Sequence, residues 1–217
     1  MPTTLDHLVV AADTLERGVA HVETCLGVTC EQGGQHPRMG THNALLRLGL
    51  DSYIEVIAID PDAGPPEMPR WFGLDDPAIR ALLRERPRLL TWVAHTTDIT
   101  ATIESALHDP GPVRRMQRGN LEWQIAFADD GALIEDGLVP SLIEWGPDTV
   151  HPAKQLNERG IELKRLTVRH AHPERLRSRL AALGLVERVE IAAPGSGERE
   201  PALQALLDTP QGEQWLT

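Results

Sequence analysis

The chain has 217 residues, which is enough to bury a substantial core as one domain or as a pair of fused small modules. Hydrophobic residues make up 41% and charged residues 24%, and the net charge is -11. That charge argues against a nucleic-acid partner and against binding to an anionic membrane surface, because both require concentrated positive charge. We find no apolar run near the roughly 20 residues of a membrane span and no signal peptide. The two cysteines do not suit a disulfide scaffold, and we expect a cytoplasmic protein.

The first predicted element is a β-strand at residues 5–13 that carries His7 on the face of its apolar residues. Side chains alternate along a strand, so His7 is expected to point toward the interior. A helix follows, with Thr14 as its N-cap and Gly27 as its end signal. A histidine therefore enters the core just ahead of a helix.

A short strand at residues 28–31 and a glycine-rich loop at 33–40 come next. The loop lacks the lysine and Ser/Thr ending of a phosphate-binding loop. His36 and His42 flank it and are candidates for the mouth of a cleft, with a solvated loop position as the alternative.

Two strands are predicted at residues 43–48 and 52–59. Both faces of the second strand are mostly apolar, which indicates a buried strand. Glu55 lies among these apolar side chains, and a buried carboxylate requires a cation, a proton or a hydrogen-bond donor.

Residues 60–88 contain many prolines and are interpreted as a connector with a short helix. Trp71 and Phe72 are expected to pack this connector down. A lid that carries these two aromatics over a site is the alternative.

The pattern then repeats. Residues 90–98 align with 5–13 at an offset of 85, a helix follows, and strands are predicted at 113–117, 121–128 and 141–145. The segment Ser141-Leu-Ile-Glu144 repeats Ser52-Tyr-Ile-Glu55 at an offset of 89. Two agreements at nearly equal offsets indicate duplication of a unit of roughly 90 residues.

The remaining chain predicts a partial third copy, with a strand at 163–170, a helix from Pro173, later short strands and a turn at Gly195-Ser196-Gly197. We therefore divide the chain into a first module (1–60), a connector (61–88), a second module (89–150) and a partial third unit (160–217), packed together as one domain.

The doubled unit resembles the vicinal oxygen chelate superfamily, and more narrowly the glyoxalase-like domain family. The segments that carry this resemblance are Leu5-Asp-His-Leu-Val-Val, the loop with His36-Pro37 and Gly40-Thr41, Tyr53-Ile-Glu, Thr91-Trp-Val-Ala, Arg118-Gly-Asn-Leu-Glu-Trp123 and Pro140-Ser-Leu-Ile-Glu-Trp145. The resemblance implies an α+β fold of tandem βαβββ modules, each curled into half a barrel, that enclose a cleft.

Metal-dependent members of this superfamily take ligands from the first and fourth strands of both modules. Carried onto this chain, the resemblance implies metal ligands at His7, Glu55 and Glu144, with Zn, Ni, Mn or Fe as the divalent ion. The fourth ligand position falls on Trp92, which cannot bind a metal. The implied activity is that of a lyase, isomerase or dioxygenase acting on a small oxygenated substrate, with Glu55 or Glu144 as the catalytic base.

The candidate substrate-binding residues are His36, His42, Trp92, Arg118 and Trp123. Arg118 suits a carboxylate or phosphate, and the two tryptophans suit an aromatic wall. The alternative function is a metal-free protein of the same fold that binds or sequesters a small molecule. Whether the modules pair within one chain or across a homodimer stays open at this point.

Overall fold

The computed structural model describes residues 3–195 and 202–217. The first module follows the predicted order of strand, helix and three strands: β1 (Thr4–Ala11), α1 (Leu15–Leu26), β2 (Glu31–His36), β3 (Thr41–Leu48) and β4 (Ser52–Ile59). Thr14 caps α1 by accepting a hydrogen bond from the backbone of Arg17, and Gly27 ends it with a φ of 70°.

The glycine-rich stretch differs from the predicted loop, because its first part belongs to β2. A side chain at Gly33 would collide with Asn43 on β3, and the backbone N–H of Gly34 donates to Asn43 Oδ1 at 2.8 Å. Glycine is therefore needed for close approach of the two strands rather than for a loop. The consequence is that His36 stands at the end of a strand, buried within the protein.

The connector contains a short 3₁₀ helix, η1 (Trp71–Gly73), and α2 (Pro77–Glu85). The second module has β5 (Arg88–His95), α3 (Ile99–Ser105), β6 (Val113–Arg118), β7 (Leu121–Ala126), the 3₁₀ turn η2 (Ile134–Gly137) and β8 (Ser141–Trp145). The 3₁₀ turn η3 (Pro152–Lys154) precedes the third unit, which has β9 (Glu162–Arg169), α4 (Pro173–Ala182), η4 (Val186–Arg188), β10 (Glu190–Ala192), β11 (Ala202–Thr209) and β12 (Gly212–Leu216). Ser196 and Gly197, expected in a turn, lie outside the described residues.

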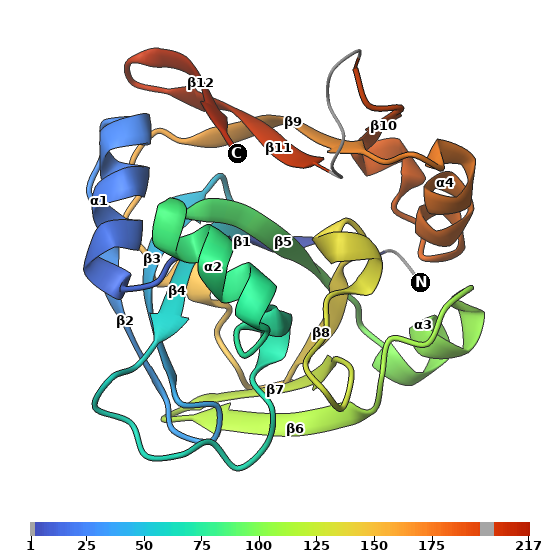
Figure 1. Ribbon diagram of the computed structural model, residues 1–217, viewed down its shortest axis with the longest axis horizontal. Coiled ribbons are helices and arrows are strands. Elements are labelled where there is room, and N and C mark those ends of the chain that lie inside the picture. Colours follow the sequence, from blue (N-terminus) through green and yellow to red (C-terminus); the bar gives the residue numbers. More distant parts are fainter. Residues whose placement is uncertain (1–2, 196–201) are drawn as a thin grey trace.

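The two modules pair within this chain and form a single eight-stranded sheet with the order β2-β3-β4-β1-β5-β8-β7-β6. Each module places its first strand beside its last in parallel, and the two first strands, β1 and β5, pair antiparallel in the middle. The sheet curls, so that the β2–β3 and β6–β7 hairpins form its two ends (Figure 1).

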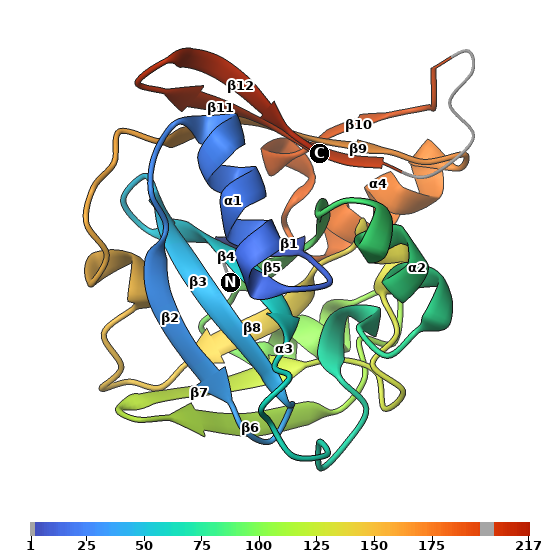
Figure 2. The same cartoon turned by 60° about the vertical axis from the view of Figure 1, so that its left-hand side comes forward.

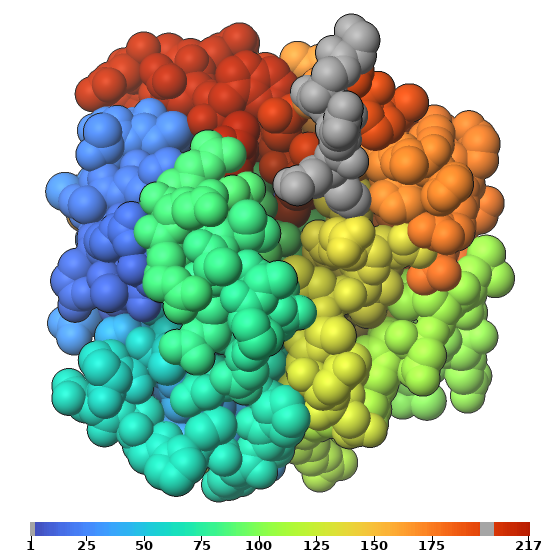
Figure 3. All heavy atoms as spheres, viewed as in Figure 1, coloured from blue at the N-terminus to red at the C-terminus, as the bar shows by residue number. Residues whose placement is uncertain are grey.

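The two faces of the curled sheet have separate cores. On the convex face, Leu8 and Trp92 pack against apolar residues of the third unit, whose four-stranded sheet β10-β9-β11-β12 lies above β1 and β5 in Figures 1 and 2. On the concave face, Val9 and Val93 pack against Trp71 and Phe72 of the connector. The connector, teal to green, covers much of the face seen in Figure 3. The central strands are thus buried on both faces, which explains their nearly continuous apolar sequences.

Candidate functional site

A cavity of about 40 Å³ lies on the concave side of the sheet, between the two modules and beneath the connector. This volume gives room for about three water molecules. The walls combine polar side chains of the first module with aromatic and aliphatic side chains of the connector and second module. They are His7, His36, Asn43, Leu45, Tyr53, Glu55, Trp71, Phe72, Arg118, Leu121, Trp123, Ile125, Ile143, Trp145 and Pro152.

A β-bulge in β1 sets the geometry of one wall. Leu5 pairs with Ala94 and His7 with Val93, so Asp6 is an extra residue without a counterpart on β5. Such an insertion lets two consecutive side chains turn to the same side of a strand. Asp6 Oδ1 accordingly lies 2.7 Å from His7 Nδ1.

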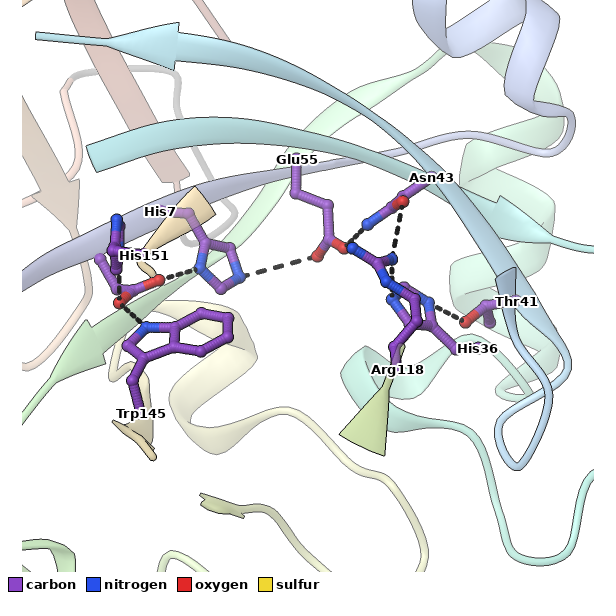
Figure 4. A network of polar contacts seen from close by, with 9 residues as sticks. His7, His36, Thr41, Asn43, Glu55, Arg118, Trp145 and His151 are labelled. Atoms are coloured by element: carbon purple, nitrogen blue, oxygen red, sulfur yellow. Dashed lines mark hydrogen bonds and ion pairs between the residues drawn. The ribbon is translucent and has the colours of Figure 1, made fainter. Parts of the chain in front are cut away.

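Asp6 is fully buried and holds three donors together. Besides His7, its carboxylate accepts hydrogen bonds from Trp145 Nε1 at 2.8 Å and His151 Nε2 at 3.1 Å (Figure 4). Burial alone would raise the pKa of Asp6, but the hydrogen bonds from His151 and His7 outweigh it and hold that pKa well below its usual value. Asp6 is therefore ionised, and an ionised carboxylate only accepts hydrogen bonds.

This fixes the role of each nitrogen of His7. Nδ1 must carry the hydrogen donated to Asp6. Nε2, the nitrogen that faces Glu55, is therefore the acceptor of the neutral ring. The ring of Tyr53 stacks on the imidazole, with the centroids 4.6 Å apart, and limits its rotation. His7 is thus held in one tautomer and one orientation.

Glu55 lies on the neighbouring strand β4 and is also buried. Asn43 Nδ2 donates to its Oε1 at 2.5 Å, while Oε2 lies 3.6 Å from His7 Nε2. A separation of 3.6 Å is too long for a hydrogen bond. The imidazole and the carboxylate therefore face each other in the cavity wall but form no hydrogen bond with each other.

Arg118 reaches this group from the opposite end of the sheet. Its Nη1 donates to His36 Nε2 at 2.9 Å and to Asn43 Oδ1 at 3.2 Å (Figure 4). A guanidinium only donates, so His36 Nε2 is an acceptor and its Nδ1–H faces Thr41 Oγ1 at 3.1 Å. Burial, and then the charge of Arg118, lower the pKa of His36 to about 3, which keeps its imidazole neutral.

Three of the residues expected from the sequence lie outside this cavity, and Trp92 is the first. It pairs with Leu8 and faces the convex side of the sheet, where its indole Nε1 donates to the backbone oxygen of Leu138 at 3.0 Å. The alignment of the two modules made Trp92 the counterpart of His7, but the extra residue in β1 shifts that alignment by one, and Val93 is the residue of β5 that pairs with His7. Trp92 fills the core and does not line the cleft.

Glu144 and His42 also lie outside the cavity, because side chains alternate along a strand. Ile143 and Trp145 line the cavity, so Glu144 between them points to the other side of β8. Its Oε2 accepts a hydrogen bond at 2.7 Å from the backbone N–H of Ile99, at the positive end of α3. His42 alternates in the same way with Asn43 and is absent from the cavity walls.

The donor set does not fit a resident divalent transition metal. Within residues 3–195 and 202–217, no group of three or more His, Cys, Asp and Glu side chains is placed to hold a metal ion. Of the three ligands expected from the sequence, His7 and Glu55 come together and Glu144 does not, whereas protein metal sites normally supply at least three ligands. The second module presents Ile143 and Trp145 where further ligands would be required, and Arg118 adds a positive charge.

Five residues of the site were not expected from the sequence, namely Asp6, Asn43, Tyr53, Trp145 and His151. Regular alternation would point Asp6 away from His7, and a bulge leaves no mark in the alternation of apolar residues. His151 lies in the segment between β8 and η3, where no periodic pattern predicts its orientation. Tyr53, by contrast, shares a strand face with Glu55, which was a usable signal.

Comparisons with known proteins identify the fold and the family. A model of the glyoxalase-like domain family matches residues 5–184. The chain belongs to this family. The curled sheet of paired βαβββ modules with a partial third module is accordingly that of the vicinal oxygen chelate superfamily. A search of curated proteins found no match.

Several solved structures are similar to this glyoxalase-like protein. A hypothetical protein from Staphylococcus aureus has a TM-score of 0.60 at 16% identity, over 99% of this chain and 84% of the other. A methylmalonyl-CoA epimerase in complex with methylmalonyl-CoA and NH₄⁺ has a TM-score of 0.42 at 16% identity, over 68% and 97% of the chains. The methylmalonyl-CoA epimerase from Mycobacterium tuberculosis has a TM-score of 0.41 at 17% identity, over 67% and 89%. In the described residues, no helix has the length and apolar character needed to cross a membrane.

Proposed function

We propose that this glyoxalase-like protein is a lyase or isomerase that moves a proton on a small oxygenated compound without a resident metal. The observation that carries the proposal is the arrangement of Asp6, His7 and Glu55 in the cavity wall. Asp6 fixes the tautomer of His7, and His7 Nε2 faces the carboxylate of Glu55 across 3.6 Å.

The pair can share the two halves of a proton transfer. His7 Nε2, which carries no hydrogen in the tautomer that Asp6 fixes, removes a proton from a carbon next to a carbonyl; the electron pair of the broken C–H bond forms a C=C bond, and the carbonyl π pair moves onto the oxygen. The imidazolium passes this proton to Glu55, and Glu55 returns it to the same carbon from the opposite face, which restores the C=O bond. Asn43 holds the Glu55 carboxylate in place by its hydrogen bond to Oε1.

The walls of the cavity support this chemistry by excluding water. Trp123, Ile125 and Ile143 are each at most 8% exposed, and they close the side opposite the polar groups. A charge that develops on the substrate oxygen would interact more strongly with Arg118 there than in bulk water.

Binding without reaction is the second candidate function. The aromatic walls of Trp71, Trp123 and Trp145 suit ligand binding whether or not a proton moves. The two candidates predict the same occupied cavity but differ in exchange of substrate hydrogen with solvent.

Hydrogen exchange in D₂O separates them. Methylglyoxal, glycolaldehyde, dihydroxyacetone and pyruvate would be incubated with the protein, with and without a metal chelator, and loss of C–H signals followed by ¹H NMR. We expect catalysed exchange of at least one compound, insensitive to chelator and reduced about 10²-fold or more in His7→Gln and Glu55→Gln. Exchange that appears only with added metal would contradict the proposal, and ligand binding without exchange would support the second candidate.

A further inference from the structure

We propose that the cavity is selective for carboxylates, which it recognises through the guanidinium of Arg118 and the indole N–H of Trp71. This inference rests on the proposed function for the position of the reacting carbon, and it names the substrate class of the same site as small carboxylates.

Among the described residues, Arg118 is a cation that forms no ion pair with a carboxylate. Other arginines of the protein form ion pairs, such as Arg114 with Asp129 and Arg70 with Asp75, each at 2.6 Å. In the described part of the chain, the hydrogen bonds of Arg118 run from Nη1 to two neutral acceptors, and no carboxylate forms an ion pair with it. Its other N–H donors are left for a ligand, and a guanidinium matches a carboxylate in charge and in geometry.

Trp71 supplies a second, independent observation. Its side chain is 3% exposed, its ring meets that of His36 edge-on at 5.1 Å, and its indole Nε1 has no hydrogen-bond partner. A buried N–H without an acceptor is rare and requires an explanation. Among the described residues that carry such an atom, Trp71 is the one that lines the cavity. A ligand oxygen there would provide the missing acceptor.

The surrounding side chains are arranged to keep Arg118 ready for an anion. His36 is neutral and therefore holds the guanidinium without competing for the ligand. Asn43 presents its oxygen to Arg118 and its amide to Glu55, and so lies between the cation and this carboxylate. An ion pair between Arg118 and Glu55, which would neutralise the site, is not formed.

The size and layout of the cavity agree with a carboxylate. Space for about three water molecules accommodates the carboxylate group itself, and because the cavity is partly open, the rest of a small acid need not fit within that volume. His7 and Arg118 lie on either side of the Glu55 carboxylate in Figure 4. A carboxylate bound by Arg118 and Trp71 therefore directs the adjoining carbon toward Glu55 and His7, which are the groups proposed to move its proton.

Intrinsic tryptophan fluorescence provides the test, because Trp71, Trp123 and Trp145 all line the cavity. Pyruvate, glyoxylate and acetate would be titrated against the wild-type protein, with the neutral amide pyruvamide as the matched probe. We expect pyruvate to bind about tenfold or more tightly than pyruvamide, since a hydrogen-bonded charge adds at least that much to affinity. Equal affinities, or no binding of any of the three carboxylates, would overturn the proposal.

Three substitutions assign the preference to its residues. Arg118→Gln is expected to remove the preference for pyruvate, and Arg118→Lys to keep part of it, which guards against a folding defect in the first variant. Trp71→Phe keeps the ring and should weaken pyruvate binding about fivefold. Arg114→Gln is the control, because Asp129 holds that guanidinium outside the cavity. A preference that survives Arg118→Gln would contradict the assignment.

The outcome is distinguishable from that of the proton-transfer proposal. Catalysed exchange without a preference for carboxylates would overturn the inference and leave the proposed function standing. If the preference for carboxylates depends on Arg118 but the protein catalyses no exchange and His7→Gln binds pyruvate normally, the proposed function is overturned and the inference stands.

Discussion

His7 Nδ1 and Asp6 Oδ1 lie 2.7 Å apart although the two residues are neighbours in one β-strand. In a regular strand their side chains would point to opposite faces. The bulge between Leu5 and His7 brings them to the same side, and all further geometry of the site follows from that one extra residue.

Asp6→Asn tests the role of this pair. An asparagine amide can donate toward His7 Nδ1, which would shift the imidazole hydrogen to Nε2 and remove the base that faces Glu55. We expect the rate of catalysed hydrogen exchange to fall about 10²- to 10⁴-fold. Pyruvate titration by fluorescence is the control, because Arg118 is untouched. An unchanged exchange rate would show that the tautomer of His7 does not matter.

Glu55→Gln and Glu144→Gln form a matched pair of isosteric substitutions. Glu55 faces His7 in the cavity, whereas Glu144 binds the N-terminus of α3. We expect the first to abolish hydrogen exchange. The second should leave exchange intact and lower the free energy of unfolding by about 0.5–1 kcal/mol, as measured by urea titration. Loss of exchange in both variants would show that Glu144 also takes part in the reaction.

Trp92→Phe tests whether this tryptophan serves the core. It removes the donor to the Leu138 carbonyl and leaves that buried oxygen without its partner. We expect the free energy of unfolding to fall by about 1–3 kcal/mol, with no effect on exchange or on pyruvate affinity. A stable variant with impaired binding would place Trp92 in the cleft after all.

His36 should make the protein sensitive to acid. Its pKa is about 3 in the folded protein and near 6.5 when unfolded, so between these values the unfolded chain binds a proton that the folded chain does not. The free energy of unfolding should therefore fall as the pH drops below about 6.5, by up to about 1.4 kcal/mol per pH unit from this residue.

Urea titrations between roughly pH 7.5 and 4.5 would compare the wild type with His36→Gln, which should show the shallower slope. Burial also lowers the pKa values of His21 and His108, and these residues contribute equally to both proteins. Because the pKa of Asp6 is lowered in the folded protein, its contribution to the free energy of unfolding is fully present above the usual carboxyl pKa. This contribution is lost only at pH values below the range of the titrations. Parallel slopes would show that His36 is not responsible.

The alternation of apolar residues and the repeat of roughly 90 residues were sufficient to predict the doubled module and the approach of His7 to Glu55. Both depend on periodicity, which dominates wherever a strand is buried on one or both faces. The errors arose where one local feature outweighed the pattern. The bulge in β1 shifts the alignment of the two modules by one residue, so that Trp92, the expected counterpart of His7, lies in the core, and the contact of Gly33 with Asn43 turned an expected loop into a strand.

Asp6 could not have been joined to the site in this way, and although Arg118 was expected there, its contacts could not have been predicted. The charge of Asp6 is stabilised by Trp145 and His151, which are distant in sequence. Arg118 is positioned by His36 and Asn43 of the other module. Such contacts depend on how the sheet curls, and no short segment of sequence encodes that curvature.

The guanidinium of Arg118 belongs to the β6–β7 hairpin, whereas both of its hydrogen-bond partners belong to the β2–β3 hairpin. These hairpins are the two rims of the curled sheet, and they are separated by all of its other strands. A molecule that bridges this arginine to Glu55 on β4 would link the β6–β7 rim to the first module on the opposite side of the cavity. Binding of such a molecule would make the whole protein more resistant to heat and proteolysis, including regions far from the cavity.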